Sequence, residues 1–287
     1  MISESPLIVI GMHRSGTSFA TSWLHSMGMN LGDDLIGSGL GNVKGHFEDR
    51  EFHDNHEWVF KNHRIKYGAL RFPVDFDLSS EERTRLSGTI IKKNNENKQW
   101  GWKDPRTCLF LDFYHKILPK AKYFILYRPC NEVVDSLLRR QILRKDRKYL
   151  KKSKLHRLKY KLVKKIYHKN IRKLNTETYI RIWVYYNNKI MELINNIDPS
   201  DYVICDQESL LRSGKQNFNQ LLVWGFKLKY ISIYSLFNKD LFKHGHVENY
   251  TKSNYSEADF LNRFFQDRIR GNKGMLSSKT STNPSTI

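Results

Sequence analysis

The feature that most constrains the fold of this chain is an apolar run followed directly by a glycine-containing loop. Leu7-Ile8-Val9-Ile10 is typical of a buried β-strand, and Gly11-Met12-His13-Arg14-Ser15-Gly16-Thr17-Ser18 follows it. Apolar residues then recur at helical spacing, at Phe19, Trp23, Leu24 and Met27. This order predicts a strand, a phosphate-binding loop and a helix, because the backbone N–H groups of such a loop and the helix N-terminus behind it attract a phosphate.

The loop differs from a triphosphate-binding loop at one decisive position. Its glycines have the spacing of the motif G-x-x-x-x-G-K-S/T, but Thr17 stands where that motif has lysine. Because that lysine contacts the β- and γ-phosphates, its absence argues against a triphosphate ligand. Arg14, inside the loop, supplies a positive charge instead. We therefore expect a nucleotide with a different terminal group.

Three segments resemble motifs of the sulfotransferases that use 3′-phosphoadenosine 5′-phosphosulfate (PAPS). The loop from His13 to Phe19 resembles the family's 5′-phosphosulfate loop. Tyr123-Phe124-Ile125-Leu126-Tyr127-Arg128-Pro129, with Ser136 eight residues after the arginine, resembles the 3′-phosphate element. Gly101-Trp102-Lys103-Asp104-Pro105-Arg106 resembles a stretch that bacterial members have between the other two. The motifs occur in the family's order, and the resemblance covers roughly residues 7–225.

The resemblance implies that PAPS is the co-substrate, that no metal is needed, and which residues bind PAPS. Arg14 and the loop N–H groups would hold the 5′-phosphosulfate, whereas Arg128 and Ser136 would bind the 3′-phosphate. Phe19 lies where the family has an aromatic residue on the adenine, with a core role as the alternative. The loop hydroxyls can also cap the helix. The full donor-binding set is Arg14, Ser15, Gly16, Thr17, Ser18, Phe19, Arg128 and Ser136.

The catalytic residues implied by the resemblance are Glu48, Lys103 and His46. An acceptor hydroxyl needs a base to become a nucleophile. Glu48 follows the phosphate loop at a place that resembles that of the catalytic carboxylate in carbohydrate sulfotransferases, and His46 is the alternative base. Lys103 stands where family members keep a lysine that contacts the transferring sulfonate. The small-molecule branch instead has a histidine where this chain has Pro105, which favours a carbohydrate acceptor.

Two other local patterns have structural interpretations. Asp104 and Pro105 are typical of the N-cap and the first position of a helix, and Arg106 receives no role. His53-x-x-His56 has the spacing of a helical metal site but lacks a third ligand, so we predict no metal.

The predicted fold class is α/β, with a P-loop-type parallel β-sheet flanked by helices on both faces. Helical patterns alternate with the expected strands, which is typical of right-handed βαβ units. Gly11, Lys103 and Arg128 fall at carboxyl ends of strands, where ligands bind in such sheets. We expect strands at 7–11, 98–103, 122–127 and 202–206, a mobile glycine loop at 36–45, a buried helix at 176–196, one domain over 1–270 and a disordered tail over 271–287.

Positive charge is concentrated in one segment. The net charge is +20, and residues 139–173 contribute +16, with 17 Lys and Arg against the single acid Asp146. Apolar residues recur there at helical spacing, at Leu155, Leu158, Leu162 and Ile166, which predicts a basic amphipathic helix or helical hairpin inserted in the domain. We expect this segment to bind an anionic glycan or an anionic membrane surface. The alternative is that it is only a charged face exposed to solvent. No nucleic-acid module accompanies the charge, so nucleic acid is not expected.

Composition and cysteine usage indicate a cytoplasmic protein. The 287 residues are 39% hydrophobic, enough for one full core, and no stretch approaches the ~20 apolar residues of a membrane-spanning helix. The first strand begins too early to leave room for a signal peptide. Cys108, Cys130 and Cys205 lack metal spacing and are predicted to be reduced core thiols. At most, the protein is expected to be peripheral at the membrane.

Together these patterns predict transfer of a sulfuryl group from PAPS to a hydroxyl of a carbohydrate or glycolipid acceptor. Two alternatives remain open. A nucleotide kinase on the same loop is disfavoured by Thr17 in place of lysine and by the lack of a clear aspartate-ended strand for magnesium. A non-catalytic polyanion-binding protein on the same fold is disfavoured by the presence of Arg14, Arg128, Ser136 and a nearby carboxylate.

Overall fold

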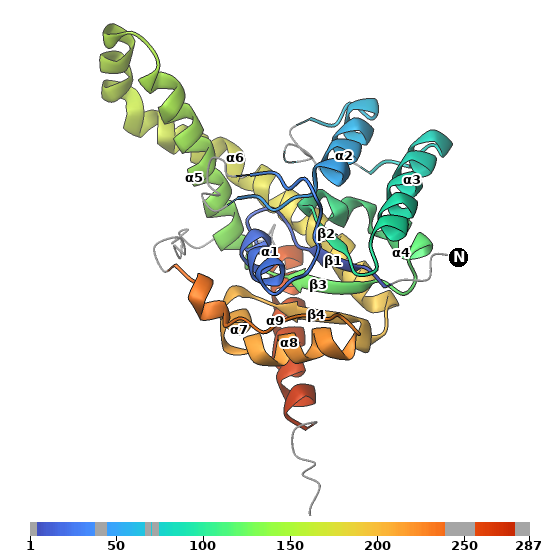
Figure 1. Ribbon diagram of the computed structural model, residues 1–287. Coiled ribbons are helices and arrows are strands. Elements are labelled where there is room, and N and C mark those ends of the chain that lie inside the picture. The colour runs from blue at the N-terminus through green and yellow to red at the C-terminus, as the bar shows by residue number, and fades with distance from the viewer. Residues whose placement is uncertain (1–4, 38–44, 67–69, 71–74, 239–255, 279–287) are drawn as a thin grey trace, which may run out of the picture.

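The structure, a computed structural model, describes residues 5–37, 45–66, 70, 75–238 and 256–278 (Figure 1). Within them, four parallel strands form one sheet in the order β2-β1-β3-β4. The strands are β1 (Leu7–Ile10), β2 (Gly101–Lys103), β3 (Lys122–Leu126) and β4 (Tyr202–Cys205). Three of them are one residue shorter than predicted, and β2 begins three residues later. Val9 pairs with Lys103 on one side and Phe124 on the other, so the carboxyl ends of three strands lie side by side.

Helices connect the strands and cover both faces of the sheet (Figure 1). They are α1 (Thr17–Ser26), α2 (Arg50–Asn62), α3 (Ser80–Glu96), η1 (Pro105–Phe110), α4 (Leu111–Ile117), α5 (Cys130–Leu150), α6 (Lys154–Asn196), η2 (Pro199–Asp201), α7 (Gln207–Arg212), α8 (Gly214–Val223), η3 (Ile233–Leu236) and α9 (Ser256–Ser278).

The two faces of the sheet have separate cores, because successive side chains of a strand point to opposite sides. On β1, Leu7 and Val9 pack with residues of α1, α7 and α8. Ile8 and Ile10 pack with residues of α2, α3, α4, α5, α6 and α9. The strands therefore lie buried on both faces, as apolar parallel strands require. The predicted α/β class is confirmed.

The basic segment forms a helical hairpin that projects from the body of the molecule (Figure 1). Its two arms are α5 and the first part of α6, joined at residues 151–153. The predicted buried helix over 176–196 is the second part of α6, where Trp183, Tyr186 and Ile190 lie in the core. Residues 139–173 thus form a helical hairpin, one of the two arrangements expected, and its inner end is continuous with the core.

Helix α9 is an element that the sequence analysis did not predict. It packs on α6 and β4, and the ring of Phe265 stacks on Tyr127 with centroids 4.9 Å apart. Asn262 accepts hydrogen bonds from the hydroxyl of Tyr127 and the backbone N–H of Cys130. The helix continues to Ser278, which corrects the prediction of disorder for residues 271–278. Residues 279–287, and most of the predicted glycine loop at 36–45, lie outside the described residues.

Two further observations concern the cysteines and the lengths of the helices. Cys108, Cys130 and Cys205 are free and buried, in agreement with the predicted core thiols. Among the described helices, none is both long enough and apolar enough to cross a membrane.

Candidate active site

The loop between β1 and α1 turns sharply around two glycines. Gly11 has φ +153°, and a Cβ on it would lie 2.3 Å from the carbonyl oxygen of Leu126. Any side chain there would push the loop away from the end of β3. Gly16 is the N-cap of α1 in the left-handed conformation, with φ +94°, which glycine adopts at little cost. The loop is therefore held against the carboxyl ends of the strands, with the N-terminus of α1 behind it.

The two predicted phosphate elements meet at this loop. Nε of Arg14 donates a hydrogen bond to Oγ of Ser136 at 2.9 Å. Nη1 of Arg128 donates to the backbone oxygen of Arg14 at 3.1 Å, while its Nε bonds Glu132 at 2.9 Å. Ser136 lies in α5 and is separated from Arg14 by 122 positions in the chain. The fold therefore places Arg14 and Ser136 in contact, two residues that the sequence analysis had assigned to one binding site only through the family resemblance.

Positive charge accumulates around Arg14. Burial, with Arg140, Arg128 and Arg139 nearby, lowers the pKa of Arg14 from 12.5 to about 10. A bound anion would relieve this repulsion. Arg140 was missed by the sequence analysis, although it lies one helical turn after Ser136 on α5 and therefore on the same face. The buried Nε of Arg140 has no hydrogen-bond partner among the described residues. The charges of Glu48 and Arg106 are near enough to act on the pKa of Arg140.

The three predicted catalytic residues form one cluster beside the loop. Nζ of Lys103 donates to Oε1 of Glu48 at 3.0 Å and to Oγ of Ser18 at 3.3 Å. Nδ1 of His46 lies 3.8 Å from the same Glu48 oxygen, and the hydroxyl of Ser18 donates to the backbone oxygen of His46 at 3.1 Å. Lys103 is fully buried at the end of β2. An ammonium group between a carboxylate and the loop is placed to donate to an anion on that loop.

Burial controls the protonation of this cluster. It lowers the pKa of His46, and the opposing charge of Glu48 does not compensate. His46 is therefore a neutral imidazole at neutral pH, able to accept a proton. Burial also lowers the pKa of Lys103, although Glu48 acts in the other direction. His46 thus remains a candidate base in this geometry, beside Glu48.

Asp104 and Arg106 connect the cluster to buried polar side chains. Asp104 accepts from the backbone N–H of Arg106 at 2.9 Å and so begins η1, as predicted. The same carboxylate bonds Nη1 of Arg106 and Nδ1 of His56, each at 2.9 Å. Burial would raise the pKa of Asp104, but Arg106 and His56 hold it well below its ordinary range. Because Nη1 of Arg106 also lies 3.7 Å from Glu48, this arginine links the candidate base to a buried network.

The His53-x-x-His56 pair and Phe19 have other surroundings. His56 bonds Asp104 and the hydroxyl of Tyr114, while His53 bonds Asp54. In the described part of the chain, no group of three or more His, Cys, Asp or Glu side chains is able to hold a metal ion. Phe19 is half-buried, with its ring 6.3 Å from that of Phe237. Its placement on an adenine stays a prediction.

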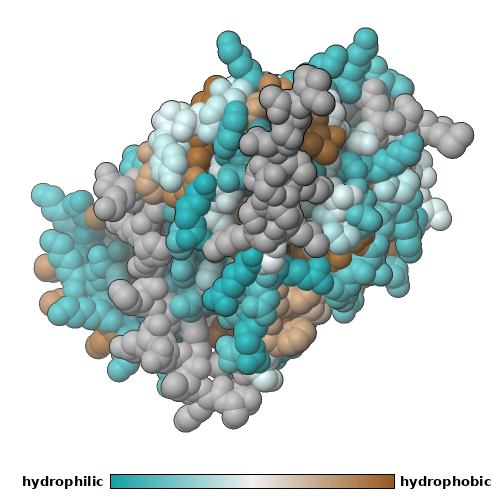
Figure 2. All heavy atoms as spheres, turned by 90° about the horizontal axis from the view of Figure 1, so that it is seen from below, coloured by the Kyte–Doolittle hydropathy of each residue, from teal (hydrophilic) through white to brown (hydrophobic). Residues whose placement is uncertain are grey.

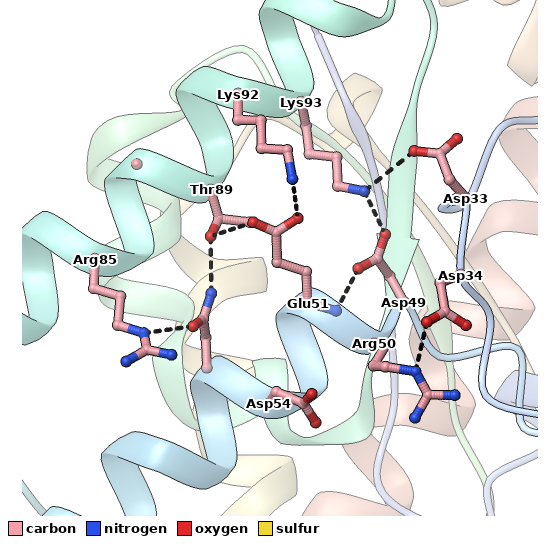
Figure 3. Close-up of a pocket in the computed structure, with 12 residues that line it drawn as sticks. Asp33, Asp34, Asp49, Arg50, Glu51, Asp54, Arg85, Thr89, Lys92 and Lys93 are labelled. Atoms are coloured by element: carbon pink, nitrogen blue, oxygen red, sulfur yellow. Dashed lines mark hydrogen bonds and ion pairs between the residues drawn. The ribbon is translucent and has the colours of Figure 1, made fainter.

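A polar hollow lies between α2 and α3 (Figure 3). None of the predicted donor-binding or catalytic residues lines it. Its charged groups pair with one another: Glu51 with Lys92 at 3.0 Å, Asp49 with Lys93 at 2.9 Å and Asp34 with Arg50. Asp49 is also the N-cap of α2 and directly follows Glu48. We infer that these ion pairs fix the position of α2, and with it the loop that carries the candidate base Glu48.

Comparison with known proteins identifies the fold. No protein-family model and no curated protein matches the sequence. The structure resembles that of sulfotransferase STF9 from Mycobacterium avium, with a TM-score of 0.51 and 14% identity over 93% of this chain and 76% of that chain. A sulfotransferase domain from a Synechococcus olefin synthase matches with a TM-score of 0.44 and 16% identity over 98% and 96% of the two chains. The likeness to STF9 shows that this chain has a sulfotransferase fold.

Two histidines lead us to expect that the protein loses stability in mild acid: His56 is fully buried, and His13 is half-buried with its Nε2 shielded from solvent. Burial lowers the pKa of His13 and of His56 below 6.5, the value expected in the unfolded chain. Below pH 6.5 the unfolded state binds protons that the folded state does not bind. The contribution of these histidines to the free energy of unfolding is therefore present above pH 6.5 and is lost as the pH falls from 6.5 through the folded pKa values. Thermal melting as a function of pH measures the effect.

A matched pair of variants isolates the contribution of one histidine. His13→Gln should flatten the fall of the melting temperature below pH 6.5, because a group that resists protonation has been removed. His25 is exposed, and His25→Gln should keep the slope of the unsubstituted protein. Equal slopes for both variants would assign the acid sensitivity to other groups.

Proposed function

We propose that the protein transfers the sulfuryl group of PAPS to a hydroxyl of a carbohydrate or glycoconjugate. The observation that carries this proposal is the convergence of two clusters on one loop without the triphosphate lysine. Arg14 and Ser136 meet at one end of the loop, and Lys103 and Glu48 meet beside Ser18 at the other. The sulfotransferase fold is consistent with this reaction. Free buried cysteines support a cytoplasmic location.

The proposed mechanism depends on positioning and electrostatics. In a sulfuryl transfer the acceptor oxygen forms a bond to sulfur while the bond from sulfur to the phosphate oxygen breaks, and negative charge spreads over the sulfonate oxygens. Arg14 and the N–H groups at the start of α1 would neutralise the leaving phosphate. Lys103 would donate to the sulfonate, and Glu48 would take the proton of the acceptor hydroxyl. The products are a sulfate ester and adenosine 3′,5′-bisphosphate.

The choice of acceptor class rests on the base. Pro105 occupies the position at which the small-molecule branch of the family is expected to have its histidine. Glu48 instead supplies a carboxylate, held at 3.0 Å from Lys103 and linked to Arg106. A carboxylate base after the phosphate loop resembles the arrangement of carbohydrate sulfotransferases. This favours a sugar hydroxyl over a phenol or steroid.

Adenosine 3′,5′-bisphosphate should stabilise the protein without magnesium, and ATP should do so much less. The reason is the arginine and serine pair predicted to read the 3′-phosphate, together with Thr17 in the lysine position. A ligand at 100 times its dissociation constant raises the free energy of unfolding by about 2.7 kcal/mol, which is visible as a melting shift. Differential scanning fluorimetry with both nucleotides measures the difference.

The same assay separates the alternatives. A melting shift with magnesium-ATP alone would indicate a nucleotide kinase and contradict the proposal. A shift with heparin-like glycans and with neither nucleotide would indicate a polyanion-binding protein. Ser136→Ala provides an internal check, because it removes the hydroxyl bonded to Arg14 and should weaken the response to the bisphosphate.

A further inference from the structure

The outer part of the α5–α6 hairpin exposes an unusual amount of apolar surface. We define the hairpin tip as residues 143–166. More than half of the large apolar side chains exposed in the described part of the chain lie there or just beyond it, and Leu162 is 78% exposed. These side chains are Leu143, Leu150, Leu155, Leu158, Leu162, Val163, Ile166 and Leu174. Single exposed leucines are ordinary, but a group of them at the end of a projection marks an interaction surface.

The hairpin tip is held in shape by its own contacts. The rings of Tyr149 in α5 and Tyr160 in α6 stack with centroids 3.9 Å apart. Asp146 accepts hydrogen bonds from the hydroxyl of Tyr160 and from His168, and pairs with Lys164 at 2.9 Å. The exposed leucines therefore belong to a packed hairpin rather than to an unfolded segment.

On α6, the apolar side chains form a stripe on the face away from α5. Leu155, Leu158, Leu162 and Ile166 recur at intervals of three or four residues, which places them on one side of a helix. Tyr160 and Lys164, which contact α5, lie on the other side. At the left of Figure 2, where the hairpin projects, hydrophobic side chains stand among hydrophilic ones.

Cations border this stripe. Lys159, Lys161 and Lys165 are exposed on α6. Asp146, the only acid between residues 139 and 173, is already engaged by groups within the hairpin. An apolar stripe flanked by long cationic side chains is the arrangement that lies in the interface of a bilayer, with the ammonium groups at the lipid headgroups.

We propose that the hairpin tip docks on an anionic lipid bilayer, with the leucine stripe among the acyl chains and the lysines at the headgroups. A soluble polyanionic glycan would pair with the lysines but leave the leucines in water. An acidic protein would need a groove complementary to a projecting hairpin, whereas a bilayer needs none. Ser136 and the hairpin tip share α5, so docking would hold the candidate site within about 20 Å of the bilayer, at 1.5 Å per residue.

Cosedimentation of the full chain with lipid vesicles tests this proposal. Vesicles of phosphatidylcholine alone are compared with vesicles that also contain phosphatidylglycerol. We expect binding to the anionic vesicles and much weaker binding to the neutral ones, with the difference reduced by added salt, because exposed charges are screened. Absence of binding to anionic vesicles at low salt would overturn the proposal and leave a protein partner as the alternative.

Two triple variants separate the apolar contribution from the charge. Leu155→Ser/Leu158→Ser/Leu162→Ser and Lys159→Gln/Lys161→Gln/Lys165→Gln should each raise the lipid concentration for half-maximal binding by about tenfold or more. The control, Leu222→Ser/Val223→Ser, removes exposed apolar side chains from α8 and should bind as the unsubstituted protein does.

The proposal does not depend on the proposed reaction, and the two fail separately. Each variant should keep the melting shift with adenosine 3′,5′-bisphosphate, which also shows that it is folded. If the leucine variant bound vesicles like the unsubstituted protein while heparin fragments displaced both, the hairpin tip would be a polyanion surface and the bilayer proposal would be wrong.

Discussion

Replacing Glu48 by glutamine should reduce sulfuryl transfer by about 10²-fold or more, as expected for the loss of a general base. Glutamine keeps the size of the side chain, and its carbonyl oxygen can still accept from Nζ of Lys103, but it cannot take the proton of an acceptor hydroxyl. The affinity for adenosine 3′,5′-bisphosphate should stay near that of the unsubstituted protein. Transfer from radiolabelled PAPS to a panel of sugar and glycolipid acceptors measures the first quantity, and melting shifts measure the second.

Two further variants make this result specific. Glu57 is a partly exposed carboxylate that bonds Nε of Arg106 at 2.6 Å, so Glu57→Gln is a matched control that should leave transfer nearly unchanged. His46→Ala tests the other candidate base. If Glu48→Gln remained active and His46→Ala were inactive, the proton acceptor would be His46, whose neutral imidazole lies 3.8 Å from Glu48.

The fold was predictable because its signals are local in the sequence. The runs Leu7–Ile10, Tyr123–Leu126 and Tyr202–Cys205 are apolar, and each forms a parallel strand buried on both faces. The remaining strand, β2, has the sequence Gly-Trp-Lys and lacks this signal. Gly11 and Gly16 have positive φ angles that residues with side chains rarely adopt, so they indicate the loop in the sequence. Because the strands are parallel, residues at their carboxyl ends, such as Lys103, lie at the same edge of the sheet.

What the sequence did not reveal depends on contacts between distant segments. Arg140 carries no motif, and its position beside Arg14 follows from the way α5 lies over the phosphate loop. Arg106 received no role because its link to Glu48 requires the loop before α2 to return to β2. Ala258, Leu261, Phe265 and Ile269 of α9 recur at helical spacing and are buried, so this helix carried a local signal that was not used. The hydrogen bond from Tyr127 to Asn262 joins distant segments and was not predictable from that signal.

Arg128→Ala should weaken the binding of 3′-phosphorylated nucleotides by about 1.5–3 kcal/mol, the range for a charge-assisted contact. The affinity for 5′-AMP should change little, because that ligand lacks the group that Arg128 is predicted to bind. Isothermal titration with adenosine 3′,5′-bisphosphate and with 5′-AMP measures both losses on the same protein. Arg181→Ala is the matched control, since Arg181 pairs with Glu177 one helical turn away on α6, as Arg128 does with Glu132, and is not among the arginines near Arg14.

The ratio of the two losses distinguishes phosphate binding from support of the loop. Nη1 of Arg128 donates to the backbone oxygen of Arg14, so alanine also removes one contact that holds the loop. That structural loss affects every ligand of the loop equally, whereas a lost phosphate contact affects only the bisphosphate. A selective loss assigns the 3′-phosphate to Arg128 and Ser136. Equal losses for both nucleotides would mean that Arg128 shapes the loop, and the 3′-phosphate would then have to be read by other cations near Arg14, with Arg140 the first to test.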